Sequence, residues 1–218
     1  MNREIGPGFR ARRFAAARGL DYIIAVAKKP TPAKPRAKPR AKSPSDYHHG
    51  DLRQALIAAA LAEVDKDSAA AISLAGLARA LGVSQAAPFR HFPDRDALLR
   101  AVAERGFTAF TEALIRAADA APKRRVLHDM ARAYVAFALA RPGLYRLMFA
   151  SNVLIKAPAG SALQRVAEGS FQLLVDAVGG RLPQALKVWS GLHGLVLLHH
   201  EGLLKDAPLD LLIGEIAR

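Results

Sequence analysis

The residues whose chemistry stands out in this chain follow a glycine at position 82 and are Ser84, Gln85, Ala86 and Ala87. A glutamine amide can make two hydrogen bonds to the edge of an adenine, and an alanine methyl can contact the methyl group of a thymine. A serine hydroxyl can donate to a phosphate oxygen. Because all four side chains are small or slim, a helix that starts with them can lie close to base edges in a major groove. This segment predicts contacts with double-stranded DNA.

Two predicted helices would position these four residues. The first has an apolar face at helical spacing and a serine, Ser73, placed to cap its start. The apolar members of that face are Leu74, Leu77, Ala78 and Leu81. Gly82 then ends the helix, and Ser84 is placed to cap a second, short one. Two helices about a tight glycine turn form a helix-turn-helix, but the same turn also joins helices in ordinary bundles, so the spacing alone leaves both interpretations open.

The flanking sequence carries a resemblance to a known family. Residues 47–51, the run GVSQAAPFRHF at 82–92 and the run PDRDALLRAV at 93–102 resemble the DNA-binding domain of TetR-family transcriptional regulators, across about residues 46–108. The resemblance implies that this domain contacts DNA, and it places Arg95 where the family usually has a phosphate-contacting lysine. The candidate DNA-binding residues are Tyr47, His48, His49, Ser73, Ser84, Gln85, Ala86, Ala87, Phe89, Arg90, His91 and Arg95.

Two positions depart from the family pattern. Phe89 stands where a tyrosine is usual, and a phenylalanine has no hydroxyl to donate to a phosphate. Pro88 stands where an aliphatic residue is common. Proline in or just after the first turn of a helix removes at most one backbone hydrogen bond, so we expect the second helix to tolerate it.

The composition predicts an all-α protein. Half of the residues (51%) are hydrophobic but only 6% are aromatic, and no long alternation of β-branched residues occurs. The absence of cysteine excludes disulfides, thiolate metal sites and cysteine nucleophiles. No apolar run approaches the roughly 18 to 20 residues that span a membrane. We expect a cytoplasmic protein.

The positive charge is concentrated at the start of the chain. Residues 1–45 contain twelve basic and two acidic residues, which accounts for +10 of the total net charge of +13. Frequent prolines, with Ala-Lys-Pro-Arg repeated at 33–36 and 37–40, predict an extended and disordered tail. Such a tail can bind phosphates without reading sequence, or it can serve as a solubilising spacer.

Residues 109–218 are expected to form a helical domain for ligand sensing and dimerisation. Prolines at 122, 142, 158, 183 and 208 each precede a helical pattern and predict five helix starts. The pattern within residues 183–201 is apolar on all sides, which indicates burial on both faces. A second copy of the chain can bury the face that the chain's own core does not cover. We therefore expect a homodimer formed through residues 183–201 and 208–218.

A second resemblance concerns this domain. Trp189, His193 and Gly194, together with the run RPGLYRLMF at 141–149, resemble the TetR subfamily named for a Trp-His-Gly signature, which implies a small-molecule effector and dimerisation. Trp189 and His193 are one turn apart and can stack at a pocket wall, or they can be ordinary core residues. The candidate ligand-binding residues are Phe107, Met130, Tyr134, Phe137, Met148, Phe149, Phe171, Trp189 and His193.

The sequence supports two other classes of function, an enzyme and an architectural protein, less well than a regulator. A metal-dependent hydrolase would use His193, His199 and His200, but His193 and His200 are separated by about two helical turns, roughly 10 Å. No glycine-rich phosphate loop or Ser-His-Asp arrangement is recognisable, so we predict no catalytic site and no cofactor. The sequence favours a ligand-responsive repressor that binds a pseudo-palindromic operator as a homodimer. Its rival is an architectural protein that coats DNA through the basic tail.

Overall fold

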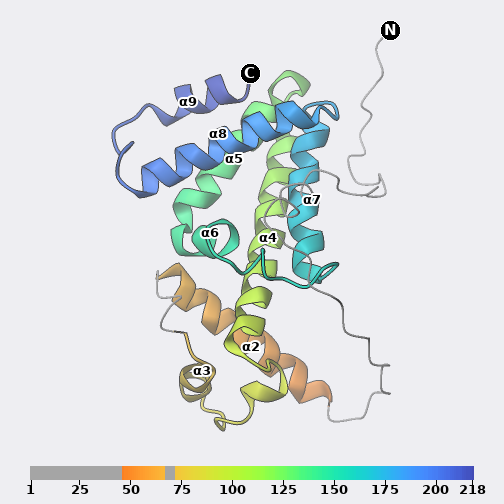
Figure 1. The fold of residues 1–218 in the computed structure, drawn as a ribbon, viewed down its shortest axis with the longest axis vertical. Helices are drawn as coiled ribbons and strands as arrows, with labels where there is room; N and C mark the ends of the chain where they lie inside the picture. The colour runs from red at the N-terminus through yellow and green to blue at the C-terminus, as the bar shows by residue number, and fades with distance from the viewer. Residues whose placement is uncertain (1–45, 67–71) are drawn as a thin grey trace. The chain divides into compact units, whose positions relative to one another are not determined.

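The computed structural model describes residues 46–66 and 72–218, and within these ranges every regular element is helical (Figure 1). This confirms the all-α prediction. The predicted tail, residues 1–45, lies outside the described residues. The helices are α2 (Asp46–Asp65), α3 (Leu74–Ala80), α4 (Arg95–Ala120), α5 (Val126–Ala140), α6 (Pro142–Phe149), α7 (Ala162–Ala177), α8 (Leu182–His200) and α9 (Leu209–Ile216), with short 3₁₀ helices η2 (Pro88–Arg90) and η3 (Lys123–Arg125).

The described residues divide into two compact units. The helix-turn-helix unit contains residues 46–66, 72–108 and 141–165, and the C-terminal unit contains residues 109–140 and 166–218. The predicted domain boundary near residue 108 therefore lies inside α4. Helix α6 and the loop after it belong to the helix-turn-helix unit, although their sequence follows the first helix of the C-terminal unit.

The helix-turn-helix unit is built around the apolar faces of α2, α3 and the first half of α4. Its fully buried side chains include Leu56, Val64, Leu98 and Val102. Helix α6 joins this core where Gly106 of α4 leaves room for it, because a Cβ atom at that position would lie 2.8 Å from the sulfur of Met148. An ion pair also ties α6 to α2: the Arg141 guanidinium lies 2.7 and 3.3 Å from the two carboxylate oxygens of Asp65.

The C-terminal unit has its core where α5 packs against α8 and α9. Buried members include Met130, Tyr134 and Val135 of α5 and Val188, Leu192 and Val196 of α8. Gly191 lets α9 approach α8, since a Cβ there would lie 3.0 Å from Ile216. Pro142 and Pro183 occupy the first turns of their helices, as predicted, and Pro208 is the N-cap residue of α9.

No helix in the described ranges is both long enough and apolar enough to cross a bilayer.

Candidate functional site

The first helix and the turn of the helix-turn-helix are held by local contacts. The Ser73 hydroxyl accepts a hydrogen bond from the backbone N–H of Gly76 at 3.0 Å, which confirms Ser73 as the cap of α3. Gly82 adopts a positive φ of 68°, a conformation that residues with a Cβ rarely adopt. The backbone N–H of Val83 then donates to the carbonyl of Ala78 at 3.0 Å and closes the turn.

The second helix differs from the prediction. Residues 85–87 form a turn, and Pro88–Arg90 form a 3₁₀ helix rather than the start of an α-helix. Pro88 has no N–H to donate to the Ser84 carbonyl, and that bond would have been the first of the α-helical ladder. The carbonyl instead accepts from the N–H of Ala87 at 3.0 Å, one residue earlier. The expectation that Pro88 would leave the helix in place was wrong, because the missing bond is the one that starts the ladder.

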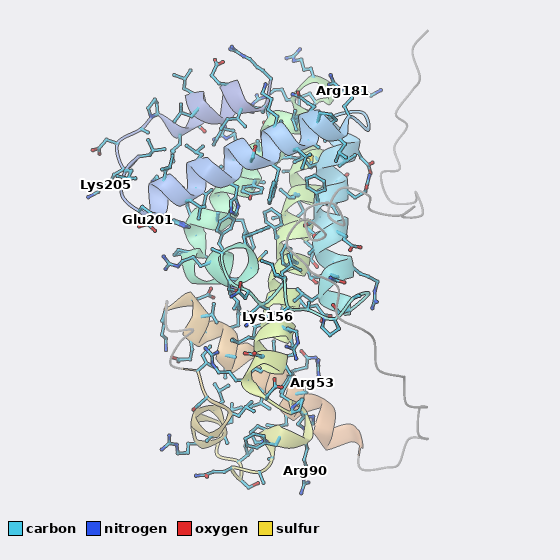
Figure 2. The ribbon with its side chains drawn as sticks, viewed as in Figure 1. Arg53, Arg90, Lys156, Arg181, Glu201 and Lys205 are labelled. Carbon is cyan, nitrogen blue, oxygen red and sulfur yellow. The ribbon has the colours of Figure 1, made fainter. Side chains whose placement is uncertain are left out.

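The segment 84–90, here called the reading turn, nevertheless presents the predicted side chains to solvent. Gln85, Ala86 and Arg90 are exposed, and Phe89 exposes 54% of its surface. Pro88 is fully buried and fixes the turn to the core. Figure 2 shows Arg90 at the edge of the unit, pointing away from it. The reading turn is thus a small polar surface with one uncovered aromatic ring.

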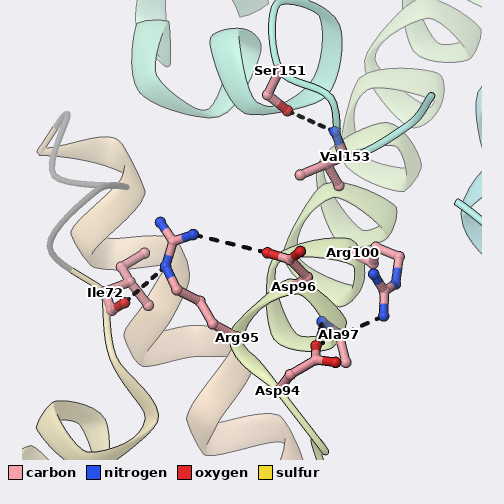
Figure 3. Close-up of polar contacts among 8 residues, drawn as sticks. All are labelled: Ile72, Asp94, Arg95, Asp96, Ala97, Arg100, Ser151 and Val153. Atoms are coloured by element: carbon pink, nitrogen blue, oxygen red, sulfur yellow. Dashed lines mark hydrogen bonds and ion pairs between the residues drawn. The ribbon is translucent and has the colours of Figure 1, made fainter. Parts of the chain in front are cut away.

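Arg95 contacts the protein at the start of both α3 and α4 (Figure 3). Its Nε donates to the carbonyl of Ile72 at 3.0 Å, and its Nη1 lies 4.0 Å from a carboxylate oxygen of Asp96. Next to it, the Asp94 carboxylate accepts from the backbone N–H of Ala97 at 2.6 Å and caps α4. Arg95 therefore holds the segment that leads into α3, and 41% of its side chain remains exposed. Its contact with a phosphate stays a prediction.

Sequence reasoning missed Arg53 in this unit. Arg53 is exposed on α2, and its guanidinium carbon lies 5.2 Å from the centre of the Phe92 ring, in a cation–π contact. Phe92 follows the reading turn and is 2% exposed. The two residues are 39 positions apart in the sequence, so no local spacing could have revealed the pair.

The C-terminal unit gathers aromatic side chains around a histidine. The Trp189 and His193 rings stack with centres 5.4 Å apart, and the Tyr134 hydroxyl lies 3.3 Å from Nδ1 of His193. Phe171 meets Trp189 edge to face at 6.2 Å. Phe110, which was not among the predicted site residues, meets Tyr134 at 5.1 Å. The stack, one of the two interpretations that the sequence left open, is therefore present, and the histidine also has a polar contact; residues of four helices form this cluster.

Burial sets the charge state of this histidine. Desolvation lowers the pKa of His193 below its usual value, because the charged imidazolium loses its hydration. His193 is therefore neutral at pH 7, with one ring nitrogen donating and the other accepting. No group of three or more His, Cys, Asp or Glu side chains with metal-binding geometry occurs among the described residues.

Comparison with known proteins identifies the family of this chain. Residues 56–102 match the family model for bacterial regulatory proteins of the tetR family, and residues 127–213 match the model for the tetracyclin repressor-like C-terminal domain. The chain belongs to the TetR family. It is a DNA-binding transcriptional regulator of that family, with a helix-turn-helix domain followed by a helical C-terminal domain.

Individual relatives agree with this assignment. A Rhodococcus sp. RHA1 protein of unknown function is 37% identical, with a TM-score of 0.69, and the match covers 81% of this chain and 95% of that one. An uncharacterised HTH-type transcriptional regulator of Mycobacterium tuberculosis is 26% identical over 162 residues, covering 72% of this chain and 74% of the relative. A TetR family regulator from Marinobacter aquaeolei VT8 shares the fold at 19% identity, with a TM-score of 0.60 and coverage of 79% and 96%.

Three of the TetR-type DNA contacts predicted from the sequence fall in the first turns of α2. Tyr47, His48 and His49 have helical backbone there, but their side chains lie outside the described residues. His91 is half-buried beside the reading turn. The phosphate contacts of these residues stay predictions.

The nine residues predicted to line a TetR-type ligand site fall into two units. Phe107, Met148 and Phe149 belong to the helix-turn-helix unit, where Phe149 contacts the rings of Phe107 and Tyr145 with centres 5.0 and 4.8 Å apart. The other six belong to the C-terminal unit; they are Met130, Tyr134, Phe137, Phe171, Trp189 and His193. The sequence could not reveal this division, because it depends on α6 packing with α2 and α4.

Proposed function

We propose that this TetR-family chain is a ligand-responsive repressor that binds a pseudo-palindromic operator as a homodimer and leaves DNA when a small molecule binds the C-terminal unit. The observation that carries the proposal is the reading turn, whose Gln85, Ala86, Phe89 and Arg90 are exposed on a capped helix-turn-helix. Such a protein acts on DNA in the cytoplasm.

The side chains of the reading turn suit different DNA groups. Gln85 matches the paired donor and acceptor of an adenine, and Ala86 and Ala87 match a thymine methyl. Arg90 carries donors that fit a guanine edge or a phosphate. In a dimer, two reading turns would occupy major grooves about one helical turn apart, roughly 34 Å.

Dimerisation through α8 and α9 is supported by apolar surface left uncovered in one chain. Leu198 of α8 exposes 44% of its surface, and Leu203 and Leu211 nearby in sequence expose 71% and 62%. A Cβ added at Gly194 of α8 would meet no atom within 4 Å, so a second helix could approach closely there. Covering such leucines with a second copy removes apolar surface from water.

The effector site is proposed around Tyr134, Trp189 and His193. Aromatic rings with one neutral hydrogen-bonding group form the usual lining of a small-molecule site, and Trp189 and His193 are only half-buried. The resemblance to the Trp-His-Gly subfamily supports the same placement. To release DNA, the effector must favour the non-binding state by about 1 to 3 kcal/mol.

The deciding experiment measures sequence preference. Genomic fragments are selected for binding to the full-length protein, and the best fragment is compared with a scrambled duplex at about 0.15 M salt. A preference of about a thousandfold supports specific repression. Equal affinity for both duplexes contradicts the proposal and favours the architectural alternative, in which the +10 charge of residues 1–45 supplies the affinity. In that case a chain shortened to begin at Ser45 should lose most of its binding.

A further inference from the structure

The charged side chains of the helix-turn-helix unit fall into two groups. Arg141 and Arg100 lie 2.7 and 3.9 Å from the carboxylates of Asp65 and Asp94, and Arg95 lies near Asp96. Arg53 and Arg90 belong to the second group, together with Arg79, Arg105 and Lys156, and none of these forms an ion pair with any residue that the structure describes. The first group holds the fold together, and the second keeps its charge available for another molecule.

Arg53 differs from Arg90 in being held in place. Its guanidinium lies over the Phe92 ring, and the sequence offers no carboxylate three or four residues away on α2 to draw it aside. The ring is itself fixed, because Phe92 is 2% exposed and its backbone N–H donates to the Pro88 carbonyl at 2.9 Å. The side chain of Arg53 is thus linked through one ring to the reading turn, and Figure 2 places both arginines on this unit.

A guanidinium that lies over an aromatic ring and is exposed to solvent keeps N–H groups available for another molecule. Those donors lie in one plane and match two oxygens of a phosphate. Because the ring already restricts the long side chain, less conformational freedom is lost when the phosphate binds.

We infer that Arg53 is a DNA-binding residue that anchors a backbone phosphate beside the reading turn, with Phe92 as the platform that orients it. The contact supplies a charged donor in a domain where Phe89 lacks the usual tyrosine hydroxyl. The inference rests on the proposed function only in requiring that the reading turn faces DNA.

The experiment uses the full-length protein and a 30-base-pair duplex of mixed sequence. Affinity is measured by fluorescence anisotropy between 0.1 and 0.3 M salt for wild type, Arg53→Gln, Arg53→Lys and a control, Arg105→Gln. Arg105 is an exposed cation of the same unit on α4, and its hydrogen bond to Gln54 places it next to the residue that follows Arg53 on α2. The control therefore removes a charge near the proposed anchor and keeps the Arg53 guanidinium over Phe92.

Arg53→Gln is expected to weaken binding by about tenfold and to make the slope of log K against log salt shallower by about 0.9. Arg53→Lys should keep most of the slope and lose about threefold in affinity, because an ammonium is a point charge without the planar fork. Arg105→Gln should leave the slope unchanged.

Two results would overturn the inference. If the salt slope for Arg53→Gln equals that of wild type or of the control, Arg53 does not contact a phosphate. If Arg53→Lys binds DNA with wild-type affinity, the contact with Phe92 does not contribute to DNA binding. Thermal melts of the variants verify folding, and if Arg53→Gln fails to fold, Arg53→Lys still tests the platform, since wild-type affinity in that variant overturns the inference.

Failure of this inference is distinguishable from failure of the proposed function. The ratio of operator to scrambled affinity tests the repressor, whereas the salt slope on mixed-sequence DNA tests Arg53. An unchanged slope with a high ratio rejects the anchor alone, and a reduced slope with a ratio near one rejects the operator-binding repressor alone.

Discussion

Replacing Gly106 by alanine should destabilise the helix-turn-helix unit even though alanine favours helix. The new Cβ would lie 2.8 Å from the sulfur of Met148 and 2.9 Å from Cδ1 of Leu144, and both side chains are fully buried. Neither can move into solvent, so α4 and α6 must separate or the two side chains must leave their rotamers.

The size of the stability loss caused by Gly106→Ala follows from two opposed effects. Exchanging glycine for alanine inside a helix stabilises by about 1 kcal/mol. Overpacking a core costs about 1 to 3 kcal/mol, and two contacts below 3 Å put this position at the upper end. We expect a net loss of about 1 to 2 kcal/mol, or about 2 to 8 °C in Tm for a chain of this size.

Urea unfolding followed by circular dichroism measures this loss. Gly214→Ala is the matched control: it lies inside α9, and its Cβ would meet no atom within 4 Å, so its stability should be unchanged or higher. In a double-mutant cycle, Gly106→Ala should cost less in a Met148→Ala background than in wild type, because the shorter side chain removes the closest contact. A Gly106→Ala protein at least as stable as wild type would refute the packing argument.

Three other predictions concern the reading turn, the histidine of the C-terminal unit and the proposed dimer face of α8. Gln85→Ala should weaken operator binding by about 1 to 3 kcal/mol at one base pair, so single-base operator variants should show lost discrimination at that position only; a uniform loss at every position would contradict base reading. His193 has its pKa lowered by burial, so the unfolded chain binds the proton first: stability should fall as pH decreases below about 6.5 towards the lowered folded pKa, and urea unfolding of His193→Gln should lack that decline. Leu198→Asp should shift a dimer towards monomer in analytical ultracentrifugation, because a carboxylate would be buried against apolar surface; an unaltered dimer would exclude this face of α8.

The features that the sequence predicted correctly depend on neighbouring residues. The Ser73 cap and the Gly82 turn are set by contacts within five residues, which helical spacing describes well. The stack of Trp189 on His193, which the sequence left open beside an ordinary core role, follows from their separation by one helical turn.

The features that the sequence did not predict depend on residues far apart in the chain. Arg95 reaches the Ile72 carbonyl 23 positions earlier, and Arg53 reaches Phe92 39 positions later. Pro88 is a different case, because its position is plain in the sequence but its effect exceeds the loss of one hydrogen bond. Helix initiation depends on the first bonds formed, and Pro88 removes one of these.

The 3₁₀ geometry of the reading turn changes how its side chains register on DNA. A 3₁₀ helix advances about 2.0 Å and turns about 120° per residue, against 1.5 Å and 100° in an α-helix. Over the two steps from Pro88 to Arg90 the difference accumulates to about 1.0 Å and about 40°. Base pairs are about 3.4 Å apart, so the residues after Pro88 face a different part of the groove from their α-helical counterparts. In the proposed complex with DNA, a residue-to-base code taken from regulators with an unbroken second helix would therefore misplace Phe89 and Arg90, and the operator has to be determined with this chain itself.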